Sequence, residues 1–367
     1  MPPFSVTDSY DAELTASSRY YLPRLRDNIV KGMKYMALLD SKGRIRYVDG
    51  GHSVMVPLMY GLNETASVMS GYDIVSTAPQ DGITMAEFTW AQCAVSITIN
   101  KKERRQNAHD KKFDLLEAKM KQAEKSIRYL MSRAIVQGTI ASSSASGSFT
   151  PIVGKLNTAA LGPLPLGAII DTDNDRTRTD VGSINPLTYS WWRNVANSST
   201  ASTFAGFKIE LYKLYNDCSK GDDQSSPDIA LGGQVAFETY HNALQTQERY
   251  VDMKTVNLLN GAENLKIKGA VFIWDELVPD TETNAILDSD GKGTAIGTLT
   301  VDTVFMINSD TVELIVDKES NYAQSDFVRP ENQVGVSTSI IDWMGAHTVN
   351  NKRKNGVLYG IAKNIVA

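Results

Sequence analysis

Apolar positions between residues 103 and 137 recur at helical spacing. Each apolar residue of this stripe follows the previous one after three or four positions: Phe113, Leu116, Met120, Ala123, Ile127, Leu130 and Ala134. Such spacing places every member on one face of a helix, and two acid–base pairs four residues apart, Glu117–Lys121 and Glu124–Arg128, favour it. The pattern predicts one amphipathic helix over 103–137, about 50 Å long, lying on a sheet. A coiled coil is disfavoured because the alanines of the stripe make a weak seam.

Two segments before this helix are patterned as strands. They are HSVMVPLMYG (residues 52–61) and FTWAQCAVSITIN (residues 88–100), which partly alternate and are rich in β-branched or aromatic residues. The residues between them, LNETASVMSGYDIVSTAPQDG, are rich in turn formers. We therefore expect an extended β-hairpin over residues 47–100, longer than a compact domain needs.

Regular patterns stop over residues 139–183, where TIASSSASGSFTP and DTDNDRTRTDVGS predict loop. Beyond this break, helical and strand patterns mix. FAGFKIELYKLYNDC and VAFETYHNALQTQ have helical periods, IKGAVFIWDELVP is typical of a strand, and TVFMINSDTVELIVD predicts a hairpin turning at residues 308–310. Asn355–Gly356 predicts another hairpin turn near the C-terminus. The order of elements indicates an α+β fold.

The charge of the chain is unevenly distributed. The 367 residues carry a net charge of −5, which implies no strong overall attraction to polyanions or membranes. Residues 47–100, however, contain acids but no Lys or Arg, whereas residues 101–133 carry 11 basic residues against 5 acidic ones, a net charge of +6. The basic helix by itself indicates a solvated face, since nothing in the sequence presents it to a nucleic-acid groove.

The N-terminus and the cysteines indicate synthesis in the cytosol. MPPFSVTDSYDAEL has neither the basic start nor the apolar run of a signal peptide. No stretch approaches the roughly 18 apolar residues of a membrane-spanning helix. Cys93 and Cys218 are expected to be free thiols in a reducing compartment. No contact with a membrane is expected.

No pattern in the sequence assembles a catalytic, cofactor or metal site. The hydrolase, zinc-protease, P-loop and dinucleotide motifs are absent, and the four histidines are scattered. Residues 171–182 resemble a calcium loop at its first acids, but Arg176 replaces the required glycine and Gly182 the bidentate glutamate. Cys93 has no base near it in sequence. We expect a protein that is not an enzyme, and an α/β enzyme is the least favoured alternative.

One short phrase and the order of the elements carry a family resemblance. GSINPLTYSWWRN (residues 182–194) contains two adjacent tryptophans, Trp191 and Trp192, followed by Arg193. This phrase, the later KIKGAVFIWDELVP, and the order of arm, hairpin, basic helix and mixed domain resemble the major capsid proteins of tailed double-stranded-DNA bacteriophages, which have the Hong Kong ninety-seven fold. The second phrase lacks the proline that is usual in the family.

The resemblance implies five parts along the chain. They are an N-terminal arm (1–46), an extended hairpin or E-loop (47–100), a peripheral domain with the spine helix and the following loop (101–183), a mainly axial domain (184–330), and C-terminal strands returning to the peripheral domain (331–367). It also implies self-assembly into hexamers and pentamers of an icosahedral shell around double-stranded DNA. The virion capsid, assembled in the host cytoplasm, is the implied location.

The implied partners are further copies of the chain, a scaffolding protein, a portal at one vertex, a cement protein and packaged DNA, with no cofactor. A separate scaffolding protein is expected because only about 45 residues precede the hairpin. Some family members cross-link covalently from a lysine in the E-loop, and the lack of lysine in residues 47–100 argues against this chemistry here. An encapsulin-like shell, which holds enzymes rather than DNA, is the alternative function.

Candidate contact residues combine the charge pattern with the resemblance. Subunit contacts are expected from Glu64, Asp73, Asp81, Trp191, Trp192 and Arg193. Contacts with DNA, without sequence preference, are expected from Lys111, Lys112, Lys119 and Lys121. For the two tryptophans, burial of the indoles within one subunit is favoured over a role at a subunit boundary.

Overall fold

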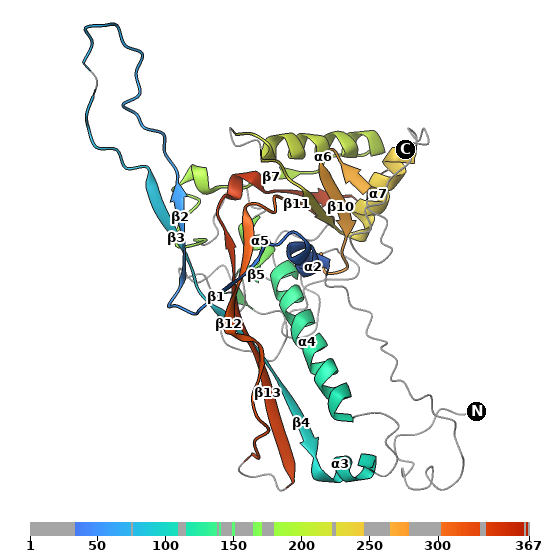
Figure 1. The fold of residues 1–367 in the computed structure, drawn as a ribbon. Helices are drawn as coiled ribbons and strands as arrows, with labels where there is room; N and C mark the ends of the chain where they lie inside the picture. Colours follow the sequence, from blue (N-terminus) through green and yellow to red (C-terminus); the bar gives the residue numbers. More distant parts are fainter. Residues whose placement is uncertain are drawn as a thin grey trace.

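Two β-sheets form the body of the molecule, and a β-hairpin projects from it (Figure 1). The computed structural model describes residues 34–74, 76–108, 115–137, 139–140, 149–150, 164–170, 180–221, 225–245, 265–278, 302–330, 335–362 and 365. The predicted N-terminal arm lies mostly outside these residues. Its described part includes helix α2 (Lys34–Ser41), whose buried face contributes Tyr35, Leu38 and Leu39 to the core.

The first sheet has four strands, in the order β1 (Ile45–Val48), β12 (Val312–Gln324), β13 (Val336–Val349) and β4 (Ala91–Asn100). β1 is parallel to β12, and the other neighbours are antiparallel. Helix α4 (Leu115–Gln137) packs on this four-stranded sheet, where Ala123 shares a buried cluster with Ile97 of β4 and Ile341 of β13. The predicted amphipathic helix on a sheet is thus confirmed for this part of the chain.

The buried face of α4 drifts by one residue from the predicted stripe. Ala123 and Ile127 are buried as predicted, whereas farther along Met131 is buried in place of Leu130. The stripe repeats on average every 3.5 residues, but a straight helix has 3.6 residues per turn, so the face that meets the sheet rotates slowly.

The prediction of one continuous helix over residues 103–137 is wrong. Helix α3 (Lys101–Ala108) follows β4 directly and points in a different direction from α4 (Figure 1). The sequence of α3, KKERRQNA, has no large apolar residue, so no stripe holds it on the sheet in line with α4. Residues 109–114, including Phe113 at the start of the stripe, lie outside the described residues.

Short elements occur within the segment predicted as loop, residues 139–183. β5 (Thr139–Ile140) pairs with β6 (Phe149–Thr150), and α5 (Leu166–Ile169) buries Leu166 and Ile169 in the core. The polar composition of residues 139–183 predicted a loop throughout. Leu166 and Ile169 are nevertheless buried, because they pack in the same core cluster as the apolar face of α4.

The second sheet has six strands, in the order β7 (Val195–Ser198), β14 (Gly356–Ile361), β11 (Asp302–Ile307), β8 (Ile229–Gly232), β10 (Ala270–Trp274) and β9 (Leu265–Ile267). The two predicted helices, α6 (Phe204–Cys218) and α7 (Gln234–Gln245), are confirmed and pack on the same cluster. Phe237 of α7 meets Phe272 of β10 there, with ring centroids 5.4 Å apart. Phe305 of β11 belongs to a core shared with the four-stranded sheet.

The predicted hairpin at residues 308–310 is wrong, because β11 and β12 belong to different sheets. The turn carries the chain from the six-stranded sheet to the four-stranded one. The Asn355–Gly356 turn likewise makes no hairpin: the short 3₁₀ helix η2 (Lys352–Lys354) leads from β13 in one sheet to β14 in the other. Alternation alone identifies strands, but the partner of a strand depends on which neighbour completes its burial.

Two of the predicted segments contribute to both sheets. β12 lies within residues 184–330, predicted as mainly axial, and pairs with β13 and β1 in the four-stranded sheet. Of the strands within residues 331–367, β13 lies in the four-stranded sheet and β14 in the six-stranded one. β14 is a central strand whose Val357 and Leu358 are buried on opposite faces, and this two-sided burial requires a sheet covered on both sides.

The projecting hairpin pairs β2 (Val54–Met59) with β3 (Ile83–Phe88), from Val54 opposite Phe88 to Met59 opposite Ile83. The predicted pairing of 52–61 with 88–100 is therefore wrong. The latter segment forms β4, whose alternate residues are buried by α4 within the four-stranded sheet. Residues 60–82 connect β2 and β3 and extend far from the body (Figure 1).

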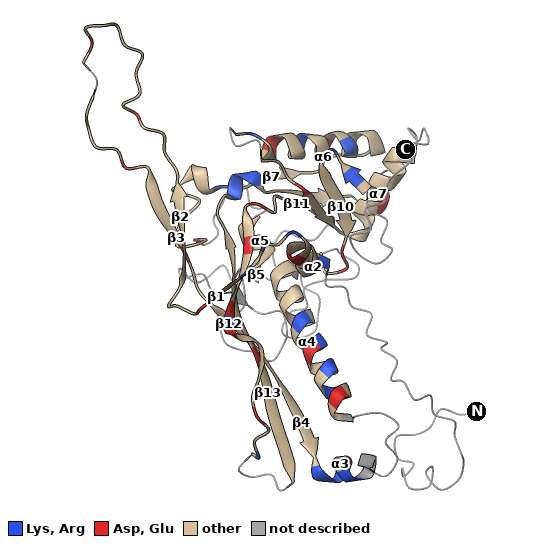
Figure 2. Cartoon of the chain, viewed as in Figure 1, with Lys and Arg blue, Asp and Glu red and all other residues tan. Residues whose placement is uncertain are grey.

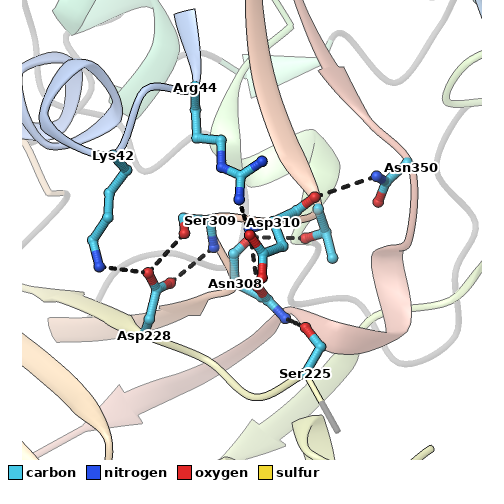
Figure 3. A network of polar contacts seen from close by, with 9 residues as sticks. Lys42, Arg44, Ser225, Asp228, Asn308, Ser309, Asp310 and Asn350 are labelled. Carbon is cyan, nitrogen blue, oxygen red and sulfur yellow. Dashed lines mark hydrogen bonds and ion pairs between the residues drawn. The ribbon is translucent and has the colours of Figure 1, made fainter. Parts of the chain in front are cut away.

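Polar side chains tie the two sheets together at the turn between β11 and β12 (Figure 3). Asp228, just before β8, accepts hydrogen bonds from the backbone N–H of Ser309 at 2.8 Å and from its hydroxyl at 2.7 Å. Asp228 also forms an ion pair with Lys42 at 2.9 Å, and Arg44 forms one with Asp310. Because Lys42 and Arg44 precede β1, these contacts join the start of the four-stranded sheet to the six-stranded sheet.

Candidate assembly surfaces

Large apolar side chains are exposed along the projecting hairpin, residues 54–88. Those more than half exposed are Met55, Met59, Leu62, Val68, Tyr72, Ile74, Ile83 and Met85. Single exposed apolar residues are ordinary, but a concentration on one projecting segment marks a surface that contacts another molecule.

The paired strands of the hairpin have two different faces. Successive side chains of a strand point to opposite sides, and the register places Pro57 opposite Met85 and Met59 opposite Ile83. These residues form the outer face and are exposed. The inner face, including Phe88, joins the core of the body. The hairpin is therefore held by one apolar face and presents the other to solvent.

The apolar outer face was missed by sequence reasoning, although a signal for it exists. Both VMVPLM and ITMAEF carry apolar residues at odd and even positions. A strand that is apolar on both faces, in a hairpin whose outer residues are exposed in the described part of the chain, predicts an external partner.

The acidic candidates Glu64, Asp73 and Asp81 are all exposed in the loop that links β2 and β3. None forms an ion pair with another residue of the described chain. Asp73 has a local role, because its carboxylate accepts the backbone N–H of Ser70 at 2.7 Å and closes a turn. The hairpin carries acidic and no basic side chains (Figure 2).

The basic candidates on α4 have partners within the chain. Lys119 donates to the backbone carbonyl of Thr98 at 3.1 Å and forms an ion pair with Glu103 at 2.8 Å. The hydrogen bond and charge of Lys119 lower the pKa of Glu103. Lys119 therefore links α4 to α3 and to the edge of β4, which was not predicted from the sequence.

Lys121 forms the predicted ion pair with Glu117, at 2.5 Å, and this contact raises the pKa of Lys121. The second predicted pair, between Glu124 and Arg128, is also present at 2.7 Å. Lys111 and Lys112 lie outside the described residues. Lys101, Lys102 and Arg105 of α3 are nevertheless exposed, and α3 lies at the end of the molecule opposite the hairpin tip (Figure 2).

The phrase GSINPLTYSWWRN folds back on its own subunit. Trp192, in the 3₁₀ helix η1 (Ser190–Trp192), is fully buried, and its indole N–H donates to the carbonyl of Val181 at 2.9 Å. Arg193 donates to the carbonyls of Pro186 at 2.7 Å and Leu187 at 2.8 Å. Trp192 is thus enclosed by its own chain, which matches the favoured expectation of burial within one subunit.

Trp191 is only partly buried, and its neighbour is the hairpin. Its ring stacks on that of Tyr60, with centroids 5.2 Å apart and an angle of 17° between the planes. Sequence reasoning missed this contact, since the two residues are 131 positions apart in the chain and share no local motif.

Buried titratable groups in the body act as structural links. His347 of β13 accepts a hydrogen bond from the hydroxyl of Tyr35 at Nε2, 3.1 Å away, and donates from Nδ1 to the carbonyl of Leu164, 2.7 Å away. Burial lowers the pKa of His347 to about 4. Cys93 and Cys218 are free, and burial raises the pKa of both thiols.

Within the described ranges, no cluster of three or more His, Cys, Asp or Glu side chains has the geometry to hold a metal ion. Among the helices described, none combines the length and the apolar character needed to cross a membrane.

Comparisons with known proteins identify the fold. No protein-family model and no curated protein sequence matches the chain. The capsid asymmetric unit of cyanophage A-1(L) is similar over 94% of this chain and 97% of that one, with a TM-score of 0.60 and 12% identity. A structure from Gordonia phage Cozz is similar over 100% of this chain and 97% of that one, with a TM-score of 0.55 and 11% identity.

An encapsulin is also similar: the holo-SrpI complex from Synechococcus elongatus PCC 7942 covers 98% of both chains, with a TM-score of 0.51 and 12% identity. At such identities the similarity is one of fold. The chain has the α+β Hong Kong ninety-seven fold of phage capsid structures, as the sequence predicted.

Proposed function

We propose that the chain is a major capsid protein that assembles into hexamers and pentamers of an icosahedral shell around double-stranded DNA. The observation that carries the proposal is the projecting hairpin. Its inner face is anchored in the core, while its outer face and its loop expose apolar side chains. Covering one such side chain contributes roughly 1.5–3 kcal/mol, so several together supply a substantial driving force for association.

The distribution of charge supports a contact between unlike surfaces. The acidic hairpin and the basic helix α3 lie at opposite ends of the molecule (Figure 2), so they cannot meet within one subunit. Between neighbours they attract, and they favour one orientation over others. A contact in which one patch meets a different patch on the next copy closes into rings when the rotation permits. We propose that Glu64, Asp73 and Asp81 face Lys101, Lys102 and Arg105 of the adjacent copy.

The remaining proposed partners follow from the shell. A scaffolding protein, a portal at one vertex and a cement protein would act on the assembled rings. Packaged DNA would meet the basic side chains without sequence preference, with Lys111 and Lys112 still candidates and Lys121 a weaker one because it is paired with Glu117. The site of action is the virion capsid, assembled in the host cytoplasm, and the role is structural rather than catalytic.

A compartment shell of the encapsulin kind is the second candidate, because the fold is similar to that of an encapsulin over nearly the whole chain. The net charge of +6 on residues 101–133 favours a nucleic-acid cargo.

Negative-stain electron microscopy of the purified chain, with and without its scaffolding protein, tests the proposal. Closed shells or rings of five and six subunits are expected. Uniform monomers under both conditions contradict it. If shells form in cells, their contents separate the two candidates: double-stranded DNA for a capsid, and a protein cargo for a compartment.

A further inference from the structure

Besides its inner face, which joins the core, the projecting hairpin contacts residues 181–193 at two separate places. The first is a tight turn at Gly182 and Ser183, and the second is the ring of Trp191. We call residues 181–193 the hairpin socket. The hairpin socket contains the adjacent tryptophans and Arg193. Trp192 and Arg193 make contacts within their own chain, so a contact with a neighbouring subunit does not account for them.

The first contact is between backbones. Val181 and Ile184 exchange hydrogen bonds at 3.1 and 3.2 Å, with φ positive at both residues between them, as in a two-residue hairpin turn. The carbonyl of Gly182 accepts the N–H of Glu87 in β3 at 3.0 Å. A Cβ atom at Gly182 would lie 2.9 Å from the Cβ of Ala86, so β3 lies directly on this turn.

The second contact lies farther along the hairpin. Tyr60, whose ring stacks on Trp191, donates its backbone N–H to the carbonyl of Gly82 at 2.9 Å, and its hydroxyl bonds the carbonyl of Asp81 at 3.1 Å. Tyr60 therefore clamps both sides of the hairpin at the point where paired strands give way to the open loop. Gly82 lies five residues from Glu87, so the two contacts are about 17 Å apart along the strand.

The socket is itself rigidly supported. The buried indole of Trp192 donates to Val181 beneath the turn, and Arg193 holds the carbonyls of Pro186 and Leu187. The ring of Trp191 meets that of Trp192 edge-on, with centroids 5.6 Å apart. Tyr60 is thus connected to the core through Trp191, which it stacks on, and through the buried ring of Trp192.

We propose that the hairpin socket sets the direction in which the hairpin leaves the body, with Trp191 and Tyr60 as its positioning residues. The inner face holds the strands of the hairpin in the core as far as Leu58. The stack of Tyr60 on Trp191 adds a fixed point where the open loop begins, and so limits the directions in which the loop can leave the body. This inference rests on the proposed function, in which the hairpin binds a neighbouring copy. A hairpin whose direction is fixed in the free chain loses less conformational entropy when it binds that copy.

Distance measurements between two spin labels test the inference on the full-length unassembled chain. One label is placed at Ser76→Cys in the hairpin loop and the other at Ala205→Cys on α6, both exposed positions. The background carries Cys93→Ser, because Cys93 is the less buried of the two native cysteines. The wild-type socket is expected to give one narrow distance distribution.

Trp191→Ala and Tyr60→Ala are each expected to broaden the distance distribution. Because both residues belong to one stacked pair, the double variant is expected to give the same breadth as either single variant. Trp191→Phe, which keeps a ring for stacking, should restore the narrow distribution. Leu187→Ala, an exposed residue of the same segment, is the matched control and should leave it unchanged. Tyr60→Ala keeps the test valid if Trp191→Ala fails to fold, because Tyr60 lies outside the body.

A narrow peak that persists in both alanine variants overturns the inference, as does equal broadening in Leu187→Ala. Because the measurement needs no assembled shell, its outcome is separate from that of the proposed function. A wild-type chain that never assembles would contradict the capsid proposal. The distance distribution of the unassembled chain would still test the role of the hairpin socket.

Discussion

The hydroxyl of Tyr35 and Nε2 of His347 lie 3.1 Å apart in the core, where they join α2 to β13 by a hydrogen bond. The other ring nitrogen of His347 donates to the carbonyl of Leu164. Both nitrogens are used when the imidazole is neutral with its proton on Nδ1. A second proton would bury a charge in the core, and this burial lowers the pKa of His347 to about 4. It would also remove the acceptor for the Tyr35 hydroxyl.

This link predicts a loss of stability in mild acid. The unfolded chain binds a proton at His347 near pH 6.5, and the folded chain only near pH 4. The contribution is therefore fully present above pH 6.5 and declines as the pH falls toward 4, by up to about 3 kcal/mol. Urea unfolding across this range should show a steeper decline for the wild type than for His347→Gln. Parallel curves would show that His347 does not carry the effect.

Gly182→Ala should destabilise the chain by roughly 2–4 kcal/mol, combining an unfavourable φ with a clash. The backbone φ is +61°, and the added methyl would lie 2.9 Å from Ala86 and 3.0 Å from the ring of Phe88. Gly43→Ala is the matched control, because Gly43 has a φ of +66° with no atom within 4 Å of the new methyl.

The difference between the two variants in chemical denaturation isolates the packing of the hairpin on the turn. Equal losses would mean that the turn strains the backbone without supporting β3.

Replacing the outer face of the hairpin should impair assembly and leave folding intact. Met59→Ser with Ile83→Ser removes a cross-strand apolar pair that is 81% and 69% exposed in the single chain. Each side chain contributes about 1.5–3 kcal/mol when a neighbour covers it, so the concentration needed for assembly should rise. Light scattering measures the assembly, and thermal unfolding of the unassembled chain should be unchanged.

Ile209→Ser, at an exposed apolar position on α6 away from the hairpin, controls for the general loss of an apolar side chain. Equal effects from both substitutions would remove the special role of the hairpin.

Charge reversal at Glu64 and Asp73 should also impair assembly if the acidic hairpin meets a basic surface. Glu64→Lys with Asp73→Lys places like charges together, and the wild-type assembly should weaken as salt screens the attraction. Asp73→Asn is an informative companion, since its amide oxygen can still accept the N–H of Ser70 while the charge is lost. Unchanged assembly and no salt dependence would contradict the proposed electrostatic contact.

Assembled particles should dissociate to a single monomer band on a denaturing gel. The hairpin has no lysine between residues 47 and 100, so an amide bond from a hairpin lysine to a neighbour cannot form. A ladder of covalent multimers would contradict this expectation and require a nucleophile elsewhere in the chain.

The sequence by itself determined the properties that depend on near neighbours in the chain. The stripe of α4, the two helices of the six-stranded sheet and the i,i+4 pairs of α4 were predictable, because a helix satisfies its backbone locally and shows its buried face as a period. The uneven charge and the joint order of elements were also readable, and together they indicated the fold.

Strand partners, and with them the division of the chain, were decided by tertiary structure. Alternation shows that 88–100 is extended, but only the burial supplied by α4 makes β13 its partner rather than β2. For the same reason β11 and β12 separate into two sheets instead of closing a hairpin.

The adjacent tryptophans show the same limit at the level of single side chains. Trp191 and Trp192 are equivalent in composition, yet one is enclosed beside Val181 and the other stacks on Tyr60. Sequence predicts that large apolar rings will be covered, because leaving them in water is unfavourable. Which surface covers each ring depends on contacts between residues distant in the chain, and only the folded structure specifies them.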